Sequence, residues 1–289
     1  IRLAYEKWSA QAVDQEITGG DDNAEDGFQT TIREPVSVTG PGTFFGRAQR
    51  TLTFAPSLER GWQLERVDLE DCLPIRVSVD NILTTVRNIV LRSGSPHNYL
   101  RMVEHIIALK AGMGLDNVII KVDAGDPPLF ERSSMDLVEA VERAGFRTEK
   151  KPAVYVTVKD PVTVGGPGGS FLTFLPAEDG LKRLSVDCAV DFNSAIGKQR
   201  IRFDVNRKTF RYGALARTNT TLLMMMYCKT IGKLFADVRN LGYTTKNILV
   251  AGRFWYFNKP GHIHNGKSLE AAWHRATLDL LAAVALIDR

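Results

Sequence analysis

The sequence contains few cysteines and no long apolar run. The cysteines are Cys72, Cys188 and Cys228. They form no Cys-x-x-Cys pair, which excludes a disulfide framework and predicts reduced, buried thiols. The longest apolar stretch, residues 278–287, contains Asp279 and is shorter than the roughly 20 residues that cross a bilayer. We therefore expect a soluble, cytoplasmic protein with no transmembrane span. Because the chain begins with Ile1 rather than Met, a targeting segment ahead of it stays an open alternative.

A strong excess of charge of one sign is also lacking. Lys and Arg number 37 against 33 Asp and Glu, a net charge of +4. This balance suits an anionic small substrate or a peripheral membrane contact, whereas nucleic-acid binding predicts a clustered basic surface that these dispersed cations do not provide. The apolar share of 44% and the charged share of 24% exclude a disordered or fibrous chain. The length predicts two domains.

The first 33 residues differ from the rest in composition and in apolar patterning. Residues 18–26 are small and acidic without apolar periodicity, so residues 1–33 are predicted to be an N-terminal extension with a loop inside it. Two roles stay open for it, an arm that docks a partner protein and a solvated tail. From residue 34, short alternating runs punctuated by glycine and proline are typical of an antiparallel sheet. Its predicted strands are residues 36–38, 50–54, 62–67 and 75–79.

Two helices and one further strand complete the first half. Apolar residues recur at helical spacing over residues 100–110, and two glycines end that helix. Residues 117–122 form the strand. A second helix begins at Ser133, which is predicted to form a capping box with Asp136, and ends at Gly145.

The opening motif of the first half returns in the second. PVSVTGPG begins at residue 35 and is followed by LTFAP, and PVTVGGPG begins at residue 161 and is followed by LTFLP. This repeat predicts an internal duplication and an α+β fold with two similar domains, residues 34–150 and 151–289, each a sheet packed on two helices. The expected elements of the second domain are strands at residues 184–192, 200–205 and 247–250 and helices at residues 221–240 and from residue 268.

The adjacent residues Glu104 and His105 are the first candidate for chemistry. Neighbours on a helix point about 100° apart, so one side chain can bind a metal while the other takes a proton from the metal's water. The dipeptide alone is equally compatible with an ordinary hydrogen-bonded histidine.

A second candidate pair, His274 and Asp279, lies on the last helix. Their i, i+5 spacing places them about 140° apart on a regular helix, which is a poor chelate. From spacing alone, a surface histidine and a solvated or ion-paired Asp279 are favoured. A π-bulge, which adds one residue to a helical turn, would restore the pair.

Three further positions have open alternatives. Thr218, after Arg217, is either a hydroxyl that binds an oxyanion or a helix N-cap. His262 and His264 are either a metal-binding pair or part of a solvated loop.

Several motifs of the first half stand in a fixed order: Arg87 and Leu91, MVEHI at 102–106, AGMGLDN at 111–117, PLFERSS at 128–134 and the Ala144-Gly145 helix end. Together they resemble the UDP-3-O-acyl-N-acetylglucosamine deacetylase family, zinc hydrolases of lipid A (lipopolysaccharide) biosynthesis. Weaker similarity lies at residues 42–54, 216–218 and 269–280, so the resemblance extends from about residue 35 to the end. It implies two α+β domains whose helices are sandwiched between the sheets, with zinc at the domain interface.

The resemblance also implies a site and a substrate. Glu104 matches the general base, and Thr218 the hydroxyl that stabilises the oxyanion. The implied zinc ligands are His105, His274 and Asp279, and the implied substrate-binding residues are Arg217 and Asn219. The substrate is a UDP-linked acylated amino sugar that loses its acetyl group. The family's S-G-H general acid is expected beyond Arg289.

Three departures from the family pattern leave two hypotheses. The family spacing H-x-x-x-D is H-x-x-x-x-D here, a D-G turn is Glu131-Arg132, and a phenylalanine is Asn219. The chain is accordingly either a working zinc deacetylase or a metal-free, deacetylase-like pseudoenzyme with a binding, regulatory or scaffold role. The metal content of the purified protein distinguishes the two.

Overall fold

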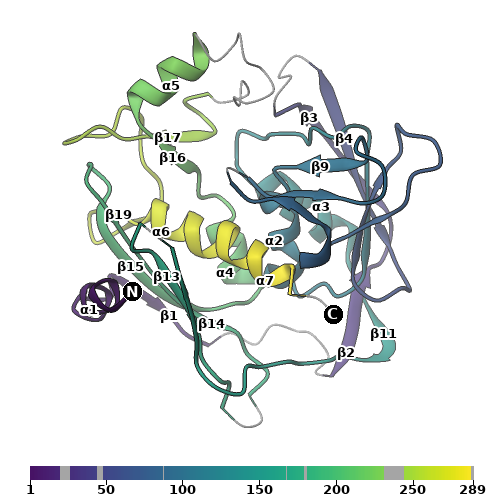
Figure 1. The fold of residues 1–289 in the computed structure, drawn as a ribbon, viewed down its shortest axis with the longest axis horizontal. Helices are drawn as coiled ribbons and strands as arrows, with labels where there is room; N and C mark the ends of the chain where they lie inside the picture. Colours follow the sequence, from purple (N-terminus) through teal and green to yellow (C-terminus); the bar gives the residue numbers. More distant parts are fainter. Residues whose placement is uncertain are drawn as a thin grey trace.

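Alternating apolar residues build a five-stranded sheet in the first half of the computed structural model (Figure 1). Its strands, in spatial order, are β3 (Val36–Pro41), β4 (Gln49–Pro56), β10 (Val118–Val122), β5 (Trp62–Arg66) and β6 (Ile75–Arg76). The predicted strands are present, with the last one shortened to Ile75–Arg76. The expectation of an antiparallel sheet is wrong for one pair, because β10 pairs parallel with β5. The chain between these two strands passes through other strands and a helix, and this long connection permits parallel pairing.

The structure describes residues 1–19, 27–43, 48–86, 88–166, 168–178, 181–230 and 244–287. Arg87, most of the acidic 18–26 stretch and residues 231–240 of the predicted helix lie outside the described residues. Within the described ranges, no helix combines the length and the apolar character that crossing a bilayer requires.

Two helices follow in the first half, α2 (Glu104–Gly112) and α3 (Met135–Ala144). The prediction that α2 starts near residue 100 is wrong, because residues 99–101 form a strand and Met102, at φ +52°, turns the chain into the helix. The capping box expected at Ser133 is wrong as well. Ser134 occupies the N-cap without a side-chain cap bond, and both serine hydroxyls lie beside the His105 ring instead.

The second half is built on the antiparallel pair β14 (Ser185–Phe192) and β15 (Gly197–Asp204). A third strand, β1 (Gln15–Ile17), pairs parallel with β15. These extension residues belong to a sheet of the chain, so of the two roles left open for the extension a solvated tail does not describe this segment.

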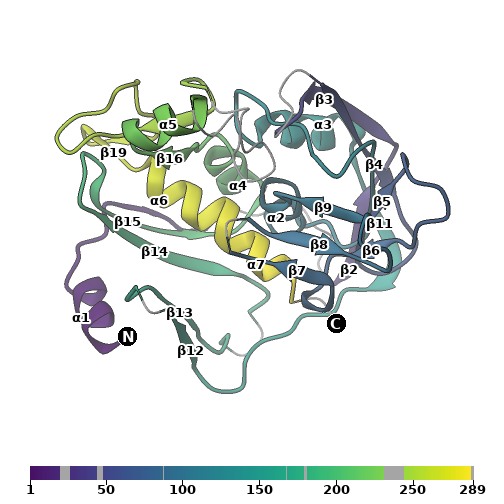
Figure 2. The ribbon, with the colours of Figure 1, turned by 45° about the horizontal axis from the view of Figure 1, so that its top comes forward.

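Three helices and one π-helical segment accompany this sheet. They are α4 (Arg207–Gly213), α6 (Glu270–His274), the π-helical Arg275–Leu280 and α7 (Leu281–Ala285). Helix α4 was not predicted, although Asn206 and Thr209 form a capping box at its start. The last three segments run as one long helix beside α2 (Figures 1 and 2).

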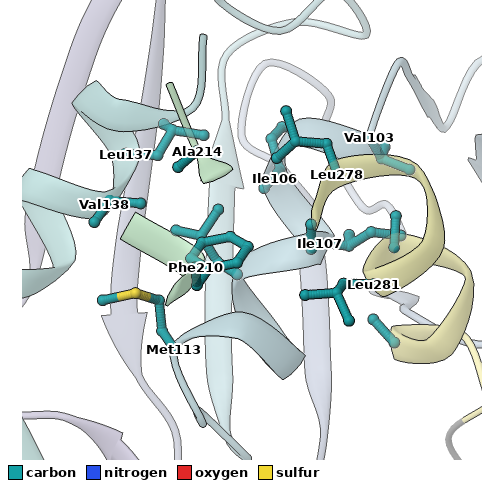
Figure 3. Packing of buried hydrophobic residues seen from close by; sticks show 14 of the residues in the cluster. Val103, Ile106, Ile107, Met113, Leu137, Val138, Phe210, Ala214, Leu278 and Leu281 are labelled. Carbon is teal, nitrogen blue, oxygen red and sulfur yellow. The ribbon is translucent and has the colours of Figure 1, made fainter. Parts of the chain in front are cut away.

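The core lies where these helices meet. Figure 3 shows Ile107 of α2, Phe210 of α4 and Leu281 of α7 packed together. Helix α3 packs on β3, and α6 packs on β14 and β15, so a helical layer lies between the two main sheets (Figure 2). The fold is α+β, as predicted.

Smaller sheets of two or three strands also occur among the described residues. They are β2 (Phe28–Ile32) with β11 (Phe146–Pro152), β7 (Ile82–Thr84) with β8 (Val90–Arg92) and β9 (Tyr99–Arg101), β12 (Val162–Gly165) with β13 (Phe171–Phe174), β16 (Thr218–Thr220) with β17 (Ile248–Val250), and β18 (Ile263–His264) with β19 (Lys267–Ser268). The remaining helices are α1 (Arg2–Ser9), α5 (Leu222–Lys229) and the 3₁₀ turn Val79–Asn81. The two copies of the repeated motif form the pairs β3–β4 and β12–β13 in matching register. The duplication of whole domains and the boundary near residue 150 stay predictions.

Candidate functional site

The first turn of α2 carries Glu104 and His105. Glu104 Oε1 accepts a hydrogen bond from the backbone N–H of Ile89, which fixes the carboxylate at the start of the helix. Nδ1 of His105 lies 3.2 Å from Ser134 Oγ and 3.4 Å from Ser133 Oγ. The Ser134 hydroxyl donates to the His105 carbonyl at 3.0 Å, so its oxygen can accept the Nδ1 proton. Nε2 of His105 is then the ring nitrogen with a lone pair.

The π-helical segment brings His274 and Asp279 together. In a π-helix the hydrogen bonds run from i to i+5, so one turn holds an additional residue and the fifth residue returns toward the same face. His274 Nδ1 lies 3.6 Å from Asp279 Oδ2, and His274 is only 3% exposed. The expectation of a surface histidine was wrong, because it assumed a regular helix.

A glycine on the neighbouring helix makes room for this segment. Thr277 is fully buried in the middle of the π-helix. A Cβ at position 213 would lie 2.1 Å from the Thr277 Oγ1, so only glycine fits there without movement of one helix.

We expect Gly213→Ala to destabilise the protein by about 1–3 kcal/mol, the usual cost of overpacking a filled core. Urea unfolding monitored by circular dichroism measures the change. Gly168→Ala is the matched control, because a Cβ there meets no atom within 4 Å. Equal stability of the two variants would show that the packing of the π-helix does not require glycine at position 213.

Thr218 and His105 adjoin the π-helical pair. Thr218 Oγ1 lies 2.8 Å from His274 Nε2, and the rings of His105 and His274 have centroids 5.4 Å apart. Thr218 belongs to β16, and Thr221 is the residue that caps the next helix. Residues more than 100 positions apart in the chain thus gather at one place between α2, β16 and the last helix.

The surroundings shift three pKa values in this cluster. Burial raises the pKa of Glu104 to about 7, against hydrogen bonds from backbone N–H groups. Burial, together with the neighbouring His274, lowers the pKa of His105 to about 4. Burial works to raise the pKa of Asp279, but contact with His274 outweighs it and holds the value at about 2. At neutral pH His105 is therefore neutral and Asp279 is a carboxylate, the forms that bind metals.

A buried ion pair supports the strand that carries Thr218. Arg217 Nε lies 2.6 Å from Oε1 of Glu270, and Nη2 lies 3.1 Å from Oε2. Glu270 is 1% exposed and also accepts the backbone N–H groups of Arg217 and Gly261. This bidentate pair joins β16 to the start of α6. Glu270 was not among the residues predicted from the sequence, although an acidic residue in the first turn of the last helix was an available signal.

The other sequence candidates lie in different surroundings. Asn219 is half-buried in β16 beside Thr218, and a substrate-binding role for Arg217 and Asn219 stays a prediction. His262 Nε2 contacts the Tyr212 carbonyl at 2.9 Å, and its ring stacks on Trp273, so it packs against the back of α6.

The donor types of the cluster suit zinc, but the described arrangement is not a complete ligand set. Two histidines and one carboxylate are a common zinc donor set. Among the residues that the structure describes, no three His, Cys, Asp or Glu side chains are placed to share one ion. Both ring nitrogens of His274 face protein atoms, and Arg275 Nη1 lies 2.5 Å from Asp279 Oδ2. An ion bound here would replace the contact of His274 with Thr218 or with Asp279.

Comparison with known proteins agrees with the motifs. A family model described as UDP-3-O-acyl N-acetylglycosamine deacetylase matches residues 29–289. UDP-3-O-acyl-N-acetylglucosamine deacetylase of Syntrophus aciditrophicus (strain SB) is 28% identical over 235 residues, 81% of this chain and 71% of that protein. The protein of the same name from Brucella ovis is 26% identical over 226 residues, 78% of this chain and 75% of its own length. The chain therefore belongs to the UDP-3-O-acyl-N-acetylglucosamine deacetylase family.

Proposed function

We propose that the chain is a zinc-dependent amide hydrolase that removes the acetyl group from a UDP-linked acylated amino sugar in lipid A biosynthesis. The observation that carries this proposal is the π-helical segment. It places Asp279 3.6 Å from His274 although the family spacing is broken by one residue. π-helical turns are rare and often mark functional sites. The presence of one here therefore supports a functional role for the contact between His274 and Asp279.

The residues that would hold zinc are His105, His274 and Asp279. The Ser134 contact directs His105 so that Nε2 is available, and the low pKa of Asp279, about 2, keeps it ionised. When bound, zinc would supply Lewis acidity that polarises a carbonyl and makes water more acidic.

The side chains around this position suit amide hydrolysis. Ionised Glu104 accepts a proton from the attacking water, and its pKa of about 7 matches a base that works near neutral pH. Thr218 Oγ, freed from His274, donates a hydrogen bond to the oxygen of the tetrahedral intermediate. The C–N bond then breaks, and the nitrogen must receive a proton to leave as an amine. The products are acetate and a free amino sugar.

Zinc content and acetate release together test this proposal. The purified chain is expected to hold about one zinc per molecule by mass spectrometry and to release acetate from the UDP-linked substrate, as a site with three protein ligands implies. His105→Ala is expected to lose both. His97→Ala, which removes an exposed histidine, is the matched control and is expected to lose neither. A folded chain that holds no zinc and releases no acetate would overturn the proposal.

A metal-free binding or scaffold protein is the second candidate function. Two observations favour it, the ion pair of Arg275 with Asp279 and the occupation of both His274 ring nitrogens by protein contacts. This candidate predicts binding of the UDP-linked sugar without turnover, which calorimetry with the zinc-free chain measures. A cytoplasmic location and a peripheral membrane contact stay predictions under either function.

A further inference from the structure

A short strand outside the family match lies in the sheet behind the candidate site. The family model begins at residue 29, whereas β1 comprises Gln15–Ile17. Its residues pair in parallel with residues 201–203 of β15. In Figures 1 and 2 this segment runs along the sheet on which the long C-terminal helix rests. This edge strand therefore comes from residues that lie ahead of the family match.

Polar contacts fix the register of this strand. Asp14 Oδ2 accepts the backbone N–H of Arg200 at 2.9 Å, and Lys267 Nζ lies 2.7 Å from Asp14 Oδ1. Side chains alternate between the two faces of a strand. Glu16 accordingly lies outward with 48% of its side chain exposed, and Ile17 packs against the core. Gln15, on the face of Ile17, is turned toward the last helix.

Gln15 binds the buried indole of Trp273. Its Oε1 accepts the Trp273 Nε1–H at 3.0 Å. Trp273 is fully buried, with its ring centroid 4.7 Å from that of Phe203 and 4.9 Å from that of Tyr212. A buried indole N–H needs an acceptor. Gln15 is the acceptor that the structure provides.

Trp273 directly precedes His274 on α6. Neighbouring side chains on a helix point about 100° apart, so the direction of the indole fixes the direction of the imidazole. A second contact holds the same turn from the same sheet, since Gln199 Oε1 of β15 accepts the Ala272 N–H at 3.0 Å. On the other side of the helix, His274 Nε2 lies 2.8 Å from Thr218 Oγ1.

We propose that Gln15 is a positioning residue of the site: by accepting the Trp273 N–H, strand β1 holds α6 in the rotation that directs His274 into the metal-binding cluster. This inference rests on the proposed zinc function. Ligand orientation by hydrogen bonds outside the ligand set is a general feature of metal sites. Here the support comes from a strand that precedes the family region.

Variants of β1 in the full chain test this role. Gln15→Leu removes the acceptor, Gln15→Glu keeps an oxygen acceptor, and Glu16→Gln changes the exposed neighbour on the same strand. Zinc affinity is measured by competition with a chelator at a temperature at which all variants are folded. We expect Gln15→Leu to weaken zinc binding about 10-fold, as for other groups that orient a ligand. Gln15→Glu should recover most of this loss, and Glu16→Gln should bind like the original chain.

Hydrogen exchange of the zinc-free protein separates this inference from the proposed function. Gln15→Leu is expected to raise amide exchange over residues 270–280, whether or not the chain binds zinc. Unchanged exchange there overturns the inference. Faster exchange with unchanged zinc affinity also overturns it, because β1 would then support the fold alone. If the original chain binds no zinc, the proposed function fails, and faster exchange over residues 270–280 then shows only that Gln15 holds helix α6 in place. If Gln15→Leu does not fold, Trp273→Phe removes the donor instead, and unchanged zinc affinity in that variant overturns the inference.

Discussion

Glu104→Gln is expected to lower the rate of acetate release at least about 100-fold while zinc content stays the same. A positioned general base contributes roughly 10² to 10⁴ to a rate, and the glutamine amide cannot accept the proton. The replacement keeps the shape of the side chain, and its carbonyl oxygen can still accept the Ile89 N–H. The measurement is kcat for acetate release together with zinc per chain. Near-normal turnover would exclude Glu104 as the base.

The same substitution is expected to stabilise the zinc-free protein above neutral pH. The pKa of Glu104 is about 7 in the folded chain against 4.5 as its ordinary value, chiefly because of burial. Because the carboxyl pKa is raised, the folded state binds more protons than the unfolded state between pH 4.5 and 7. Glu104 therefore contributes least to stability at high pH. Stability is lost as the pH rises from 4.5 through 7, by on the order of 2–3 kcal/mol for a group that is partly open to solvent.

Urea unfolding at pH 5 and pH 8 measures this effect. Glutamine does not ionise, so the gain of Glu104→Gln over the original chain should be large at pH 8 and small at pH 5. Glu34→Gln, at an exposed carboxylate, should change stability by less than about 0.5 kcal/mol at either pH. Equal gains at both pH values would contradict a raised pKa. A loss of rate combined with a gain in stability would mark Glu104 as a residue kept for function.

Local patterns predicted the elements that carry the site, and distant contacts decided how those elements were used. The strands of the first sheet and helix α2 followed from apolar periodicity. Ser133 and Ser134 have the sequence signature of a helix cap, but His105, 28 positions before Ser133, recruits their hydroxyls. Nothing local distinguishes a serine that caps a helix from one that orients a histidine.

The π-helix is a second feature that local sequence does not predict. The H-x-x-x-x-D spacing alone predicts separated side chains. A π-bulge brings the two side chains together again, but whether it forms depends on packing. Thr277 fits inside the widened turn only because Gly213 lies opposite it, 64 positions earlier in the chain. Strand β1 is a comparable case, since three residues are too few for a periodic signal and their partner strand begins at Gly197.

Asp279→Ala and Arg275→Ala are expected to change zinc affinity in opposite directions. Loss of the Asp279 carboxylate should weaken zinc binding at least about 100-fold, because groups that only orient a ligand already cost 10- to 100-fold. Arg275 binds the same Oδ2 atom that faces His274, so it competes with an ion for that oxygen. The Arg275 side chain is 51% exposed, and an ion pair of this kind is worth about 0.2–1 kcal/mol, so its removal should strengthen zinc binding by no more than about fivefold.

Chelator competition on both variants measures the two changes. Arg2→Ala is the matched control, because Arg2 forms an i, i+4 ion pair with Glu6 in helix α1, away from the site. If Arg275→Ala weakened zinc binding, Arg275 would be holding Asp279 in place rather than competing for it. If Asp279→Ala left the affinity unchanged, the π-helix would have no role in metal binding, and the metal-free function would be the better account of the chain. Opposite changes in zinc affinity would therefore identify Asp279 as a ligand and Arg275 as its competitor on the same helical turn.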